Sequence, residues 1–454
     1  MKIVLLSGGS GKRLWPLSND VRSKQFMKVL QDDKGNPESM IQRISRQIRT
    51  IHPEAQIYLV ANSVQNDPIR RQLAGSVISI SEPLRKNTYP AILLAGAYLL
   101  DKEQMDPAET IAILPVDPYV ELDYFDKIRD MDHALSESGA DICLLGIKPT
   151  YPSEKYGYIV EKKDSATGSS YKHVDHCVEK PDLPTARTLM ATGARWNGGV
   201  FVMRGGYVAG LIKDEIGEVS YEKLYNGYEN LPTISFDYRI IEKSKSLIYE
   251  EYDGEWNDIG TWNTMTKIMK HPNGGNVVSG ENCVNTHVIN ELEIPVVALG
   301  LTDTVVVASA DGILVSNKGA SSHMAPYVER VDHRPMYEKR QWGEYRVLDI
   351  SNDGPGPEKS LTKRLWVEPG RGLSCQLHHY RDEIWTVTEG EGLFMLDGTV
   401  RTVHRGEILV IERGHTHAMA SRTGCSFVEV QLGTDLVEED IERFEWDWEP
   451  YLNA

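Results

Sequence analysis

The chain has too few basic residues to balance its acidic ones. Its 454 residues include 49 Lys and Arg against 66 Asp and Glu, which gives a formal net charge of −17. Nonspecific binding to nucleic acid needs an excess of basic side chains to neutralise phosphates, and that excess is missing. We therefore expect no nucleic-acid partner, and any nucleotide site must be locally basic on an acidic body.

Cysteine pairs and long apolar runs are also missing. The five cysteines are widely spaced and form no CxxC pair: Cys143, Cys177, Cys283, Cys375 and Cys425. Such spacing predicts reduced thiols, as in cytosolic proteins. The first apolar run, KIVLL, is too short for a signal peptide, and no later run reaches the roughly 18 apolar residues of a spanning helix. We expect a cytoplasmic protein with no membrane partner.

Apolar runs alternate with helical stretches as far as about residue 270. The runs IYLVAN (57–62), TIAILPVD (110–117) and ADICLLGIK (140–148) are typical of buried strands. The stretch 89–103 has the apolar spacing of a helix. Strands alternating with helices predict an α/β, Rossmann-like domain with a mainly parallel sheet over residues 1–270.

Two Pro/Gly-rich breaks divide the rest of the chain. After KHPNGGN (270–276) come short β-rich pieces with turn signals, which predict stacked short strands over residues 271–330. After SNDGPGPEKS (351–360) strands and turns alternate again, which predicts a small all-β barrel within residues 331–454. The acidic, aromatic stretch EEDIERFEWDW (438–448) is expected to form a short helix or a cap.

A glycine-rich loop, LSGGSGKRLWPLS (6–18), follows the first expected strand. Glycine lets backbone N–H groups approach phosphate oxygens closely and lets the chain turn with positive φ. Arg13 adds a permanently charged fork that suits phosphate, and Lys24 follows nearby. The loop matches neither GxxxxGK[ST] nor GxGxxG, so a plain strand-to-helix turn stays an alternative.

Two carboxylates stand in positions typical of a metal site. LPVD places Asp117 at the carboxyl end of an expected strand, where open α/β sheets carry their sites, although such an Asp is often only a helix cap. WNDIGTW supplies Asp258 in a turn. Two hard oxygen ligands and a triphosphate are what Mg²⁺ uses, so the pair predicts a magnesium site.

Eight motifs in fixed order connect these features. They are GGSGKRLWPLS, EPLRKNTYPAI, LPVD, YGYIVE, VEKPD, WNGGVF, FDYRIIEK and WNDIGTW. Together they resemble the mannose-1-phosphate guanylyltransferase branch of the sugar-phosphate nucleotidyltransferases. The resemblance implies that GMP is transferred from GTP to a sugar 1-phosphate, mannose 1-phosphate, to give GDP-mannose and pyrophosphate with the help of Mg²⁺.

The same resemblance implies roles for individual residues. The nucleotide would be bound by Leu6, Gly8, Gly9, Gly11, Arg13, Asn87 and Thr88. The sugar phosphate would be bound by Gly157, Glu179, Lys180 and Asn197. The Mg²⁺ ligands would be Asp117 and Asp258. The catalytic cations would be Arg13, Lys24 and Lys180.

Four positions depart from the family pattern: Lys12, Ser23, Pro118 and Gly198 stand where Thr, Pro, His and Ser are usual. None of them is a charged group assigned to the chemistry, but they leave sugar and base specificity open. One alternative is the same reaction with another sugar 1-phosphate or another nucleoside triphosphate. A second is a catalytically dead sugar-nucleotide-binding regulator, which the retained Arg13 and the other charged residues make less attractive.

The C-terminal part resembles the cupin domain of a type II phosphomannose isomerase. GLSCQLHHYRDEIW and GEILVIERGHTHAMAS fit the two halves of the cupin pattern. The resemblance implies that His378, Glu383 and His417 hold a metal, for which Zn²⁺, Co²⁺ or Mn²⁺ would be suitable. The segment 276–316 is similar to the family's short left-handed β-helix.

Tyr380 leaves the activity of the cupin open, because the family has a histidine ligand at this position. His415 would compensate if the local strand were bent. Two interpretations stay open: His378, Glu383 and His417 hold a metal and the cupin is a working mannose-6-phosphate isomerase, or the site has decayed and the barrel is a structural or dimerising module. Cupins frequently pair, so a homo-oligomer is expected.

Overall fold

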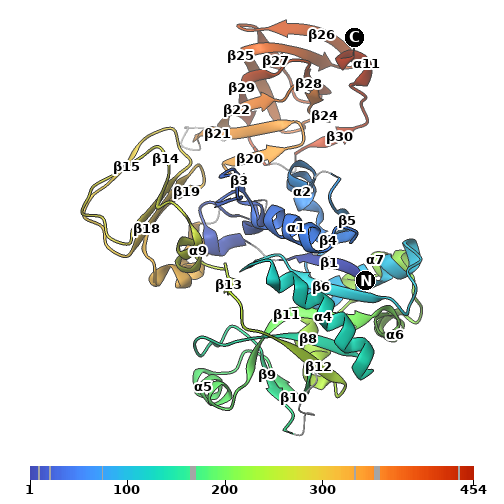
Figure 1. Ribbon diagram of the computed structural model, residues 1–454. Helices are drawn as coiled ribbons and strands as arrows, with labels where there is room; N and C mark the ends of the chain where they lie inside the picture. Colours follow the sequence, from blue (N-terminus) through green and yellow to red (C-terminus); the bar gives the residue numbers. More distant parts are fainter. Residues whose placement is uncertain are drawn as a thin grey trace. The chain divides into compact units, whose positions relative to one another are not determined.

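The computed structural model describes residues 1–8, 11–19, 22–73, 75–163, 170–331, 334–351, 358–437 and 440–453 (Figure 1). Two compact units emerge from the contacts within the chain. The first unit consists of Met1–Leu14, Arg22–Pro272 and Lys318–Met324. The second consists of Trp15–Val21, Asn273–Asn317 and Ala325–Ala454.

A nine-stranded sheet forms the centre of the first unit. In spatial order its strands are β5 (Ile78–Glu82), β4 (Ile57–Asn62), β1 (Lys2–Ser7), β6 (Thr110–Pro115), β11 (Arg195–Arg204), β8 (Ile142–Ile147), β12 (Leu247–Tyr252), β10 (Lys172–Val178) and β9 (Tyr158–Glu161). The runs 57–62, 110–117 and 140–148, which the sequence predicts as strands, are β4, β6 and β8 with their flanking residues.

The sheet is mixed. Strands β5, β4, β1 and β6 are parallel, as are β8 and β12. Strand β11 lies antiparallel to both β6 and β8, and β10 is antiparallel to its two neighbours. The parallel part is the one predicted from the sequence, whereas the direction of β11 follows from chain connections that the apolar pattern of a strand does not encode.

Both faces of the sheet are covered. Val4 and Ile113 belong to a core cluster with Ile92 of α3 and Val208 of α6, while Ile3, on the opposite face of β1, is also fully buried. The helices of this unit are α1 (Met40–Ile51), α2 (Asn66–Leu73), α3 (Thr88–Ala97), α4 (Asp123–Ser138), α5 (Leu183–Ala191), α6 (Gly205–Ile216), α7 (Tyr221–Asn226), α8 (Phe236–Arg239) and α9 (Trp262–Ile268). Continuous apolar strands are what a sheet covered on both faces requires.

The second unit begins with short parallel strands. Strands β14 (Asn273–Gly275), β16 (His287–Asn290) and β18 (Thr304–Ser309) pair in parallel, and β19 (Gly312–Asn317) joins them antiparallel. Strands β15 (Val277–Ser279) and β17 (Val296–Ala298) form a separate parallel pair. The stacked short strands expected after residue 271 are therefore present.

An eleven-stranded sheet makes up the rest of the second unit. Its strands are β20 (Tyr337–Arg340), β21 (Gly343–Ser351), β22 (Lys359–Val367), β23 (Arg371–Gly372), β24 (Cys375–Leu377), β25 (Arg381–Leu396), β26 (Thr399–His404), β27 (Ile408–Ile411), β28 (His417–Ser421), β29 (Cys425–Gly433) and β30 (Glu442–Phe444). The long strand β25 pairs with β29 over its first half and with β28 over its second half, so the sheet folds back around one core. This is the all-β barrel that the sequence predicts within residues 331–454.

The stretch 438–448, expected to form a short helix or a cap, contains a strand in its described part. Residues 442–444 form strand β30 on β24, and only Glu449–Leu452 are helical, as α11. All five cysteines are unpaired. In the described part of the chain, no helix has the length and apolar character needed to cross a membrane.

Candidate functional site

A short strand pair brings two distant carboxylates together. Asp117 follows β6 directly, at the carboxyl end of the parallel strands, and the next residues form β7 (Pro118–Val120). Strand β7 pairs antiparallel with β13 (Trp256–Asp258), in a register that sets Asp258 opposite Pro118. The two carboxylates expected to bind metal therefore lie close together, because the backbone pairing fixes them there.

Lys24 forms an ion pair with Asp117. Its Nζ lies 2.8 Å from Asp117 Oδ2 and 3.4 Å from the Ile259 carbonyl oxygen. Burial alone would raise the pKa of Asp117, but the Lys24 ammonium outweighs it and holds that pKa below its usual range. Burial and the adjacent Asp117 raise the pKa of Asp258. Asp117 is therefore ionised, and a bound cation would stabilise the ionised form of Asp258.

A buried polar network holds the segment that carries Lys24. Gln25 Nε2 donates to Ser7 Oγ at 2.8 Å, and Ser7 donates to Gln65 Oε1 at 3.2 Å. Gln65 Nε2 then donates to Ser23 Oγ at 2.8 Å. Ser23, which departs from the usual proline, therefore helps to fix the position of the lysine. No local sequence pattern predicts this network, because its members are far apart in the chain.

Arg13 adds charge to the same end of the site. It lies in a short 3₁₀ turn, Gly11–Leu14, just after β1. Its charge contributes to the lowered pKa of Asp117 and opposes the rise in the pKa of Asp258, which places it within electrostatic reach of both carboxylates. Gly8 is exposed at the end of β1, whereas Gly9 lies outside the described residues.

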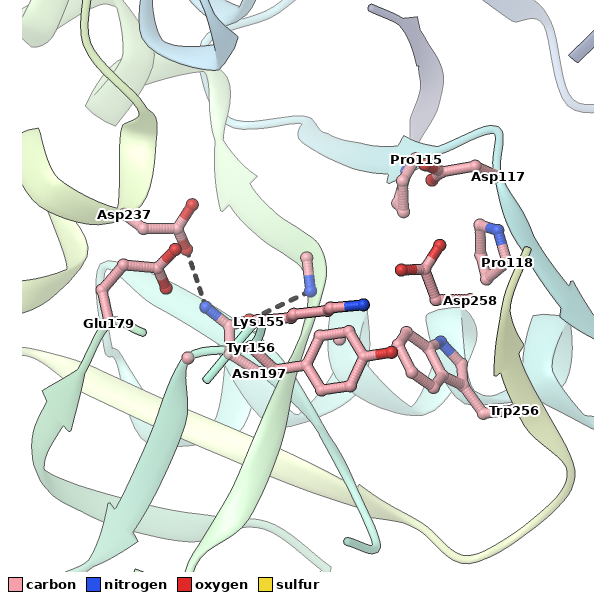
Figure 2. Close-up of a pocket in the computed structure, with 13 residues that line it drawn as sticks. Pro115, Asp117, Pro118, Lys155, Tyr156, Glu179, Asn197, Asp237, Trp256 and Asp258 are labelled. Atoms are coloured by element: carbon pink, nitrogen blue, oxygen red, sulfur yellow. Dashed lines mark hydrogen bonds between the residues drawn. The ribbon is translucent and has the colours of Figure 1, made fainter. Parts of the chain in front are cut away.

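A cavity of about 220 Å³ continues from the carboxylate pair toward a second polar group. Gly157, Glu179, Asn197 and Asp237 line it together with Asp117 and Asp258 (Figure 2). A Cβ on Gly157 would come 2.5 Å from Glu179 Oε2, so a larger residue here would push that carboxylate out of its present position. Three of the four expected sugar-phosphate residues therefore share one cavity with the expected metal ligands.

Asn197 sits in a bulge of β11 that turns its side chain into the cavity. The register of β11 on β8 shifts between Asn197 and Phe201, and Gly199 in the bulge has φ 69°. Asn197 Nδ2 donates to Asp237 Oδ1 at 2.7 Å, and Asn197 Oδ1 accepts from Gly199 N at 3.1 Å. The amide is therefore held from both ends.

Lys180 has a strained backbone and a paired side chain. Its φ of 46° is uncommon for a residue with a side chain, and such strain is concentrated at functional sites. Its Nζ lies 2.8 Å from Glu179 Oε1 and over the Tyr238 ring. Half of the Lys180 side chain is exposed, so the ammonium is available to a phosphate at the edge of the cavity.

Asn87 and Thr88 lie at the start of α3, and neither lines the cavity. Asn87 caps the helix with φ 74°, a second strained position, while Thr88 Oγ1 accepts from Phe236 N at 2.8 Å. Leu6 is half-buried in β1. The structure therefore places these three expected nucleotide contacts on elements of the same unit.

Sequence reasoning missed four residues that line the cavity: Lys155, Tyr156, Asp237 and Trp256. The rings of Tyr156 and Trp256 pack edge to face with centroids 5.3 Å apart, and Figure 2 shows the Tyr156 ring between the two polar ends with Trp256 below Asp258. The motifs KYGYIVE, FDYRIIEK and WNDIGTW contain all four residues. The sequence does not reveal that these motifs meet at one cavity, because their meeting depends on tertiary contacts.

A second cluster lies inside the barrel of the other unit. His378, Glu383 and His417 are buried, and their ligand atoms lie within 4.8 Å of one another. His378 Nε2 is 3.1 Å from Glu383 Oε1, and His417 Nε2 is 3.5 Å from Glu383 Oε2. All three residues expected to bind metal in the cupin are thus brought together.

The two histidines face inward through the same ring nitrogen. His378 Nδ1 lies 2.5 Å from the Asp440 carbonyl oxygen, and His417 Nδ1 lies 3.0 Å from that of His415. A nitrogen facing a carbonyl oxygen carries the proton, so each Nε2 is an acceptor, and that of His378 accepts from Arg381 Nη2 at 3.3 Å. His417 Nε2 is buried with no hydrogen-bond partner among the described residues, as expected for a ligand atom. The donor set fits a divalent cation.

Glu383 is held by further donors. Arg381 Nε donates to Oε1 at 3.0 Å, Trp385 Nε1 to Oε2 at 3.0 Å and Gln431 Nε2 to Oε1 at 3.2 Å. Burial would raise the pKa of Glu383, but the adjacent imidazoles of His378 and His417 hold it well below its usual range. The carboxylate is therefore ionised and fixed in orientation.

Two residues considered as additional ligands lie elsewhere. The Tyr380 side chain is 56% exposed, whereas the three clustered residues are buried. His415 is exposed and its Nδ1 lies 2.6 Å from Asp397 Oδ2. The idea that His415 compensates for Tyr380 is wrong, because the turn before β28 directs only His417 inward.

Two family models match different parts of the chain. The family described as nucleotidyl transferase matches residues 2–273, and the one described as mannose-6-phosphate isomerase C-terminal matches residues 328–446. The xanthan biosynthesis protein XanB of Xanthomonas campestris pv. campestris (strain B100) is 30% identical and the alignment covers 97% of each chain. The mannose-1-phosphate guanylyltransferase of Escherichia coli (strain K12) is 29% identical with the same coverage.

One solved structure is similar over most of the chain. It is described as a mannose-1-phosphate geranyltransferase from Thermus thermophilus, is 28% identical, and matches with a TM-score of 0.60 over 73% of this chain and 99% of that chain. The protein belongs to the nucleotidyl transferase family. Enzymes of this family generally use a divalent metal, for which Asp117 and Asp258 are the fitting carboxylates.

Proposed function

We propose that the protein is a mannose-1-phosphate guanylyltransferase. It transfers GMP from GTP to mannose 1-phosphate and releases pyrophosphate. The observation that carries this conclusion is the single cavity that joins the Asp117 and Asp258 pair to the polar group of Glu179 and Asn197. Relatives that cover almost the whole chain include a protein named for this activity.

The chemistry follows from charge. A phosphate oxygen of the sugar 1-phosphate is already anionic, so it attacks the α-phosphorus in line without a general base. The obstacle is the approach of two anions and the charge of the crowded transition state. Mg²⁺ held by Asp117 and Asp258 supplies charge neutralisation at the phosphates. Arg13 and Lys24 do the same from the protein, and Lys180 holds the sugar phosphate.

The nucleotide is proposed to lie against the loop after β1. Leu6, Gly8, Gly9 and Gly11 would contact it through the backbone, and Asn87 and Thr88 would border it at the start of α3. Support comes from the strained φ of Asn87 and from the nearness of Arg13 to both carboxylates. The domain bounds that match this assignment are residues 1–270, 271–330 and 331–454.

The test is a grid of four nucleoside triphosphates against several sugar 1-phosphates with Mg²⁺, read as pyrophosphate release. The proposal expects GTP with mannose 1-phosphate to give the highest kcat/KM. A different best pair would overturn the substrate assignment while leaving the reaction class, and no release from any pair would overturn both.

We also propose that the barrel binds Zn²⁺, Co²⁺ or Mn²⁺ through His378, Glu383 and His417. Three protein ligands and one open position are typical of a catalytic metal site. The test is zinc content after dialysis: His417→Ala should lose the metal, while His379→Ala, which removes only an exposed partner of Glu442, should keep it. Zinc at equal stoichiometry in both variants would contradict the site.

The isomerase activity expected from the family is a separate matter from metal binding. Fructose 6-phosphate formed from mannose 6-phosphate with added Zn²⁺ or Co²⁺ would establish it. No conversion by a metal-loaded protein would leave the barrel as a metal-binding module.

A homo-oligomer is the third proposal. Val278 and Val297 are register neighbours on β15 and β17, and both side chains are more than half exposed, as is that of Leu299. Adjacent exposed apolar side chains on a flat strand pair are typical of a protein interface. A second copy of the chain is the partner proposed for this surface.

A further inference from the structure

The cavity of the first unit has two chemically different ends. Lys24 and the expected metal ligands Asp117 and Asp258 lie at one end, where positive charge can collect. Glu179 and Asp237 lie at the other end, and Figure 2 shows their carboxylates side by side across from Asp258. A sugar 1-phosphate also has two different ends, one anionic and one a neutral polyol. Glu179 and Asp237 can accept hydrogen bonds from the hydroxyls of the polyol, and the Lys180 ammonium, 2.8 Å from Glu179 Oε1, is the cation available to the phosphate at this end.

Hydrogen bonds hold the Asp237 carboxylate in one orientation. It lies in α8, which Ser235 caps by accepting from Tyr238 N at 3.3 Å. One of its oxygens accepts from Asn197 Nδ2 at 2.7 Å, and Asn197 is itself fixed by Gly199 N. The carboxylate therefore cannot rotate freely, and it faces the cavity that it lines.

The charges around Asp237 leave it poorly compensated. Burial, followed by repulsion from Glu179, raises its pKa to about 7, and the Lys180 ammonium and the Asn197 amide oppose the rise only in part. A carboxyl group in this condition gains from a hydroxyl that can donate or accept a hydrogen bond. No catalytic step of the transferase uses this group.

We propose that Asp237 binds a hydroxyl of the sugar ring and selects which sugar 1-phosphate is used, with Asn197 as the residue that orients it. This inference rests on the proposed transferase function. A sugar whose hydroxyl points elsewhere leaves the Asp237 and Asn197 pair unmatched in a partly desolvated site, and sites built to hydrogen-bond a substrate group discriminate strongly for this reason.

The test compares Asp237→Ala and Asp237→Asn with Glu215→Gln. Glu215 is a matched control. This carboxylate of α6 pairs at 2.8 Å with Arg239, which lies on α8 with Asp237, and Glu215 is not one of the residues that line the described cavity. Initial rates of pyrophosphate release are measured with each substrate varied in turn. Asp237→Ala should raise the KM for mannose 1-phosphate about 10- to 100-fold, the range for losing a hydrogen bond to a charged group, while the KM for GTP stays within about twofold.

The Asp237→Asn variant distinguishes a role in sugar selection from a purely structural role. The amide keeps the size and one acceptor of the carboxylate, so it should recover part of the sugar KM while narrowing the preference for mannose 1-phosphate over glucose 1-phosphate by about fivefold or more. The Glu215→Gln enzyme should match the wild type in both measures.

Three results would overturn the inference. An unchanged KM for mannose 1-phosphate in Asp237→Ala would remove the contact, and an equal rise in both KM values would show a merely structural role. A wild-type enzyme that uses no sugar 1-phosphate would overturn the transferase function together with this inference. If the wild type turns over mannose 1-phosphate and Asp237→Ala has the same KM for it, this inference alone is overturned.

Discussion

Asp117 is the residue on which the site depends most directly. Its carboxylate pairs with Lys24 at 2.8 Å and faces Asp258, so Asp117→Asn removes a metal ligand and leaves the ammonium without its partner. We expect kcat to fall about 1000-fold, the effect of losing about 4 kcal/mol of transition-state stabilisation. Steady-state pyrophosphate release measures it, with a circular dichroism spectrum to check the fold.

Asp126→Asn is the control for that experiment. Asp126 is an exposed carboxylate on α4 that pairs only with the exposed Arg129 at 2.9 Å, so its loss should leave turnover within about twofold. A nearly wild-type rate in Asp117→Asn, or an equal loss in both variants, would contradict the metal-site assignment.

The raised pKa of Asp237 predicts that the stability of the protein depends on pH. Its folded pKa of about 7 lies above the usual carboxyl value near 4, so the folded state prefers the protonated form. The stability that this form contributes is complete below about pH 4 and is lost as the pH rises to about 7. Asp237→Asn should therefore unfold at higher urea than the wild type at pH 8, by about 1–2 kcal/mol for this half-buried group, and show no gain at pH 4. A less stable variant at pH 8 would mean that the ionised carboxylate is well paired.

The residues of the site differed in how far the sequence revealed them. Asp117 and Lys24 stand in motifs next to a strand end or a glycine loop, so residue type and position sufficed. Asp237 stands in the FDYRIIEK motif, but nothing in the motif says that its side chain meets Asn197, 40 residues earlier in the chain. Contacts of this kind depend on which strands pair, and strand pairing is not encoded locally.

At the scale of elements, β25 organises the C-terminal barrel. It carries Arg381, Glu383 and Trp385 on its buried face, and Arg381 is only 2% exposed. Glu383→Gln leaves the Arg381 guanidinium without its nearest carboxylate, and the loss of one partner of a buried ion pair typically costs about 3–5 kcal/mol. Since Asp440 remains 3.5 Å from Arg381, we expect about 3 kcal/mol in urea unfolding of the full chain.

Glu442→Gln is the comparison for the barrel. Glu442 pairs with His379 at 3.2 Å with both side chains more than half exposed, so its loss should change the unfolding free energy by less than about 0.5 kcal/mol. A Glu383→Gln protein as stable as this comparison variant would show that the buried network contributes little.

Element type was easier to predict than element direction. The apolar runs of β4, β6 and β8 and the turn-separated strands of the barrel follow from period and turn residues. The antiparallel direction of β11 and the bulge at Asn197 could not be predicted in this way. The adjacent glycines Gly198 and Gly199 do mark where the strand departs from regular pairing. The expected terminal helix became β30 because pairing with β24 outweighs local preference.

At the scale of the whole molecule, the exposed valines of the β15 and β17 pair predict self-association. Light scattering should give the wild type a mass above the 51.1 kDa of one chain. Val297→Lys should shift it toward 51.1 kDa, because a lysine in a packed interface is costly to desolvate. Thr402→Lys adds the same charge at an exposed polar position and should not. A wild type that is already monomeric would contradict the proposed interface.

The two units of the molecule carry different chemistry, and the transferase is the central claim. It is tested most directly by following a ³²P label at the α-phosphate of GTP in the presence of mannose 1-phosphate and Mg²⁺. Attack at the α-phosphorus predicts that the label appears in GDP-mannose and that a γ-phosphate label appears in pyrophosphate. Label that stays in GTP, or that appears in GDP or GMP without a sugar attached, would contradict the account.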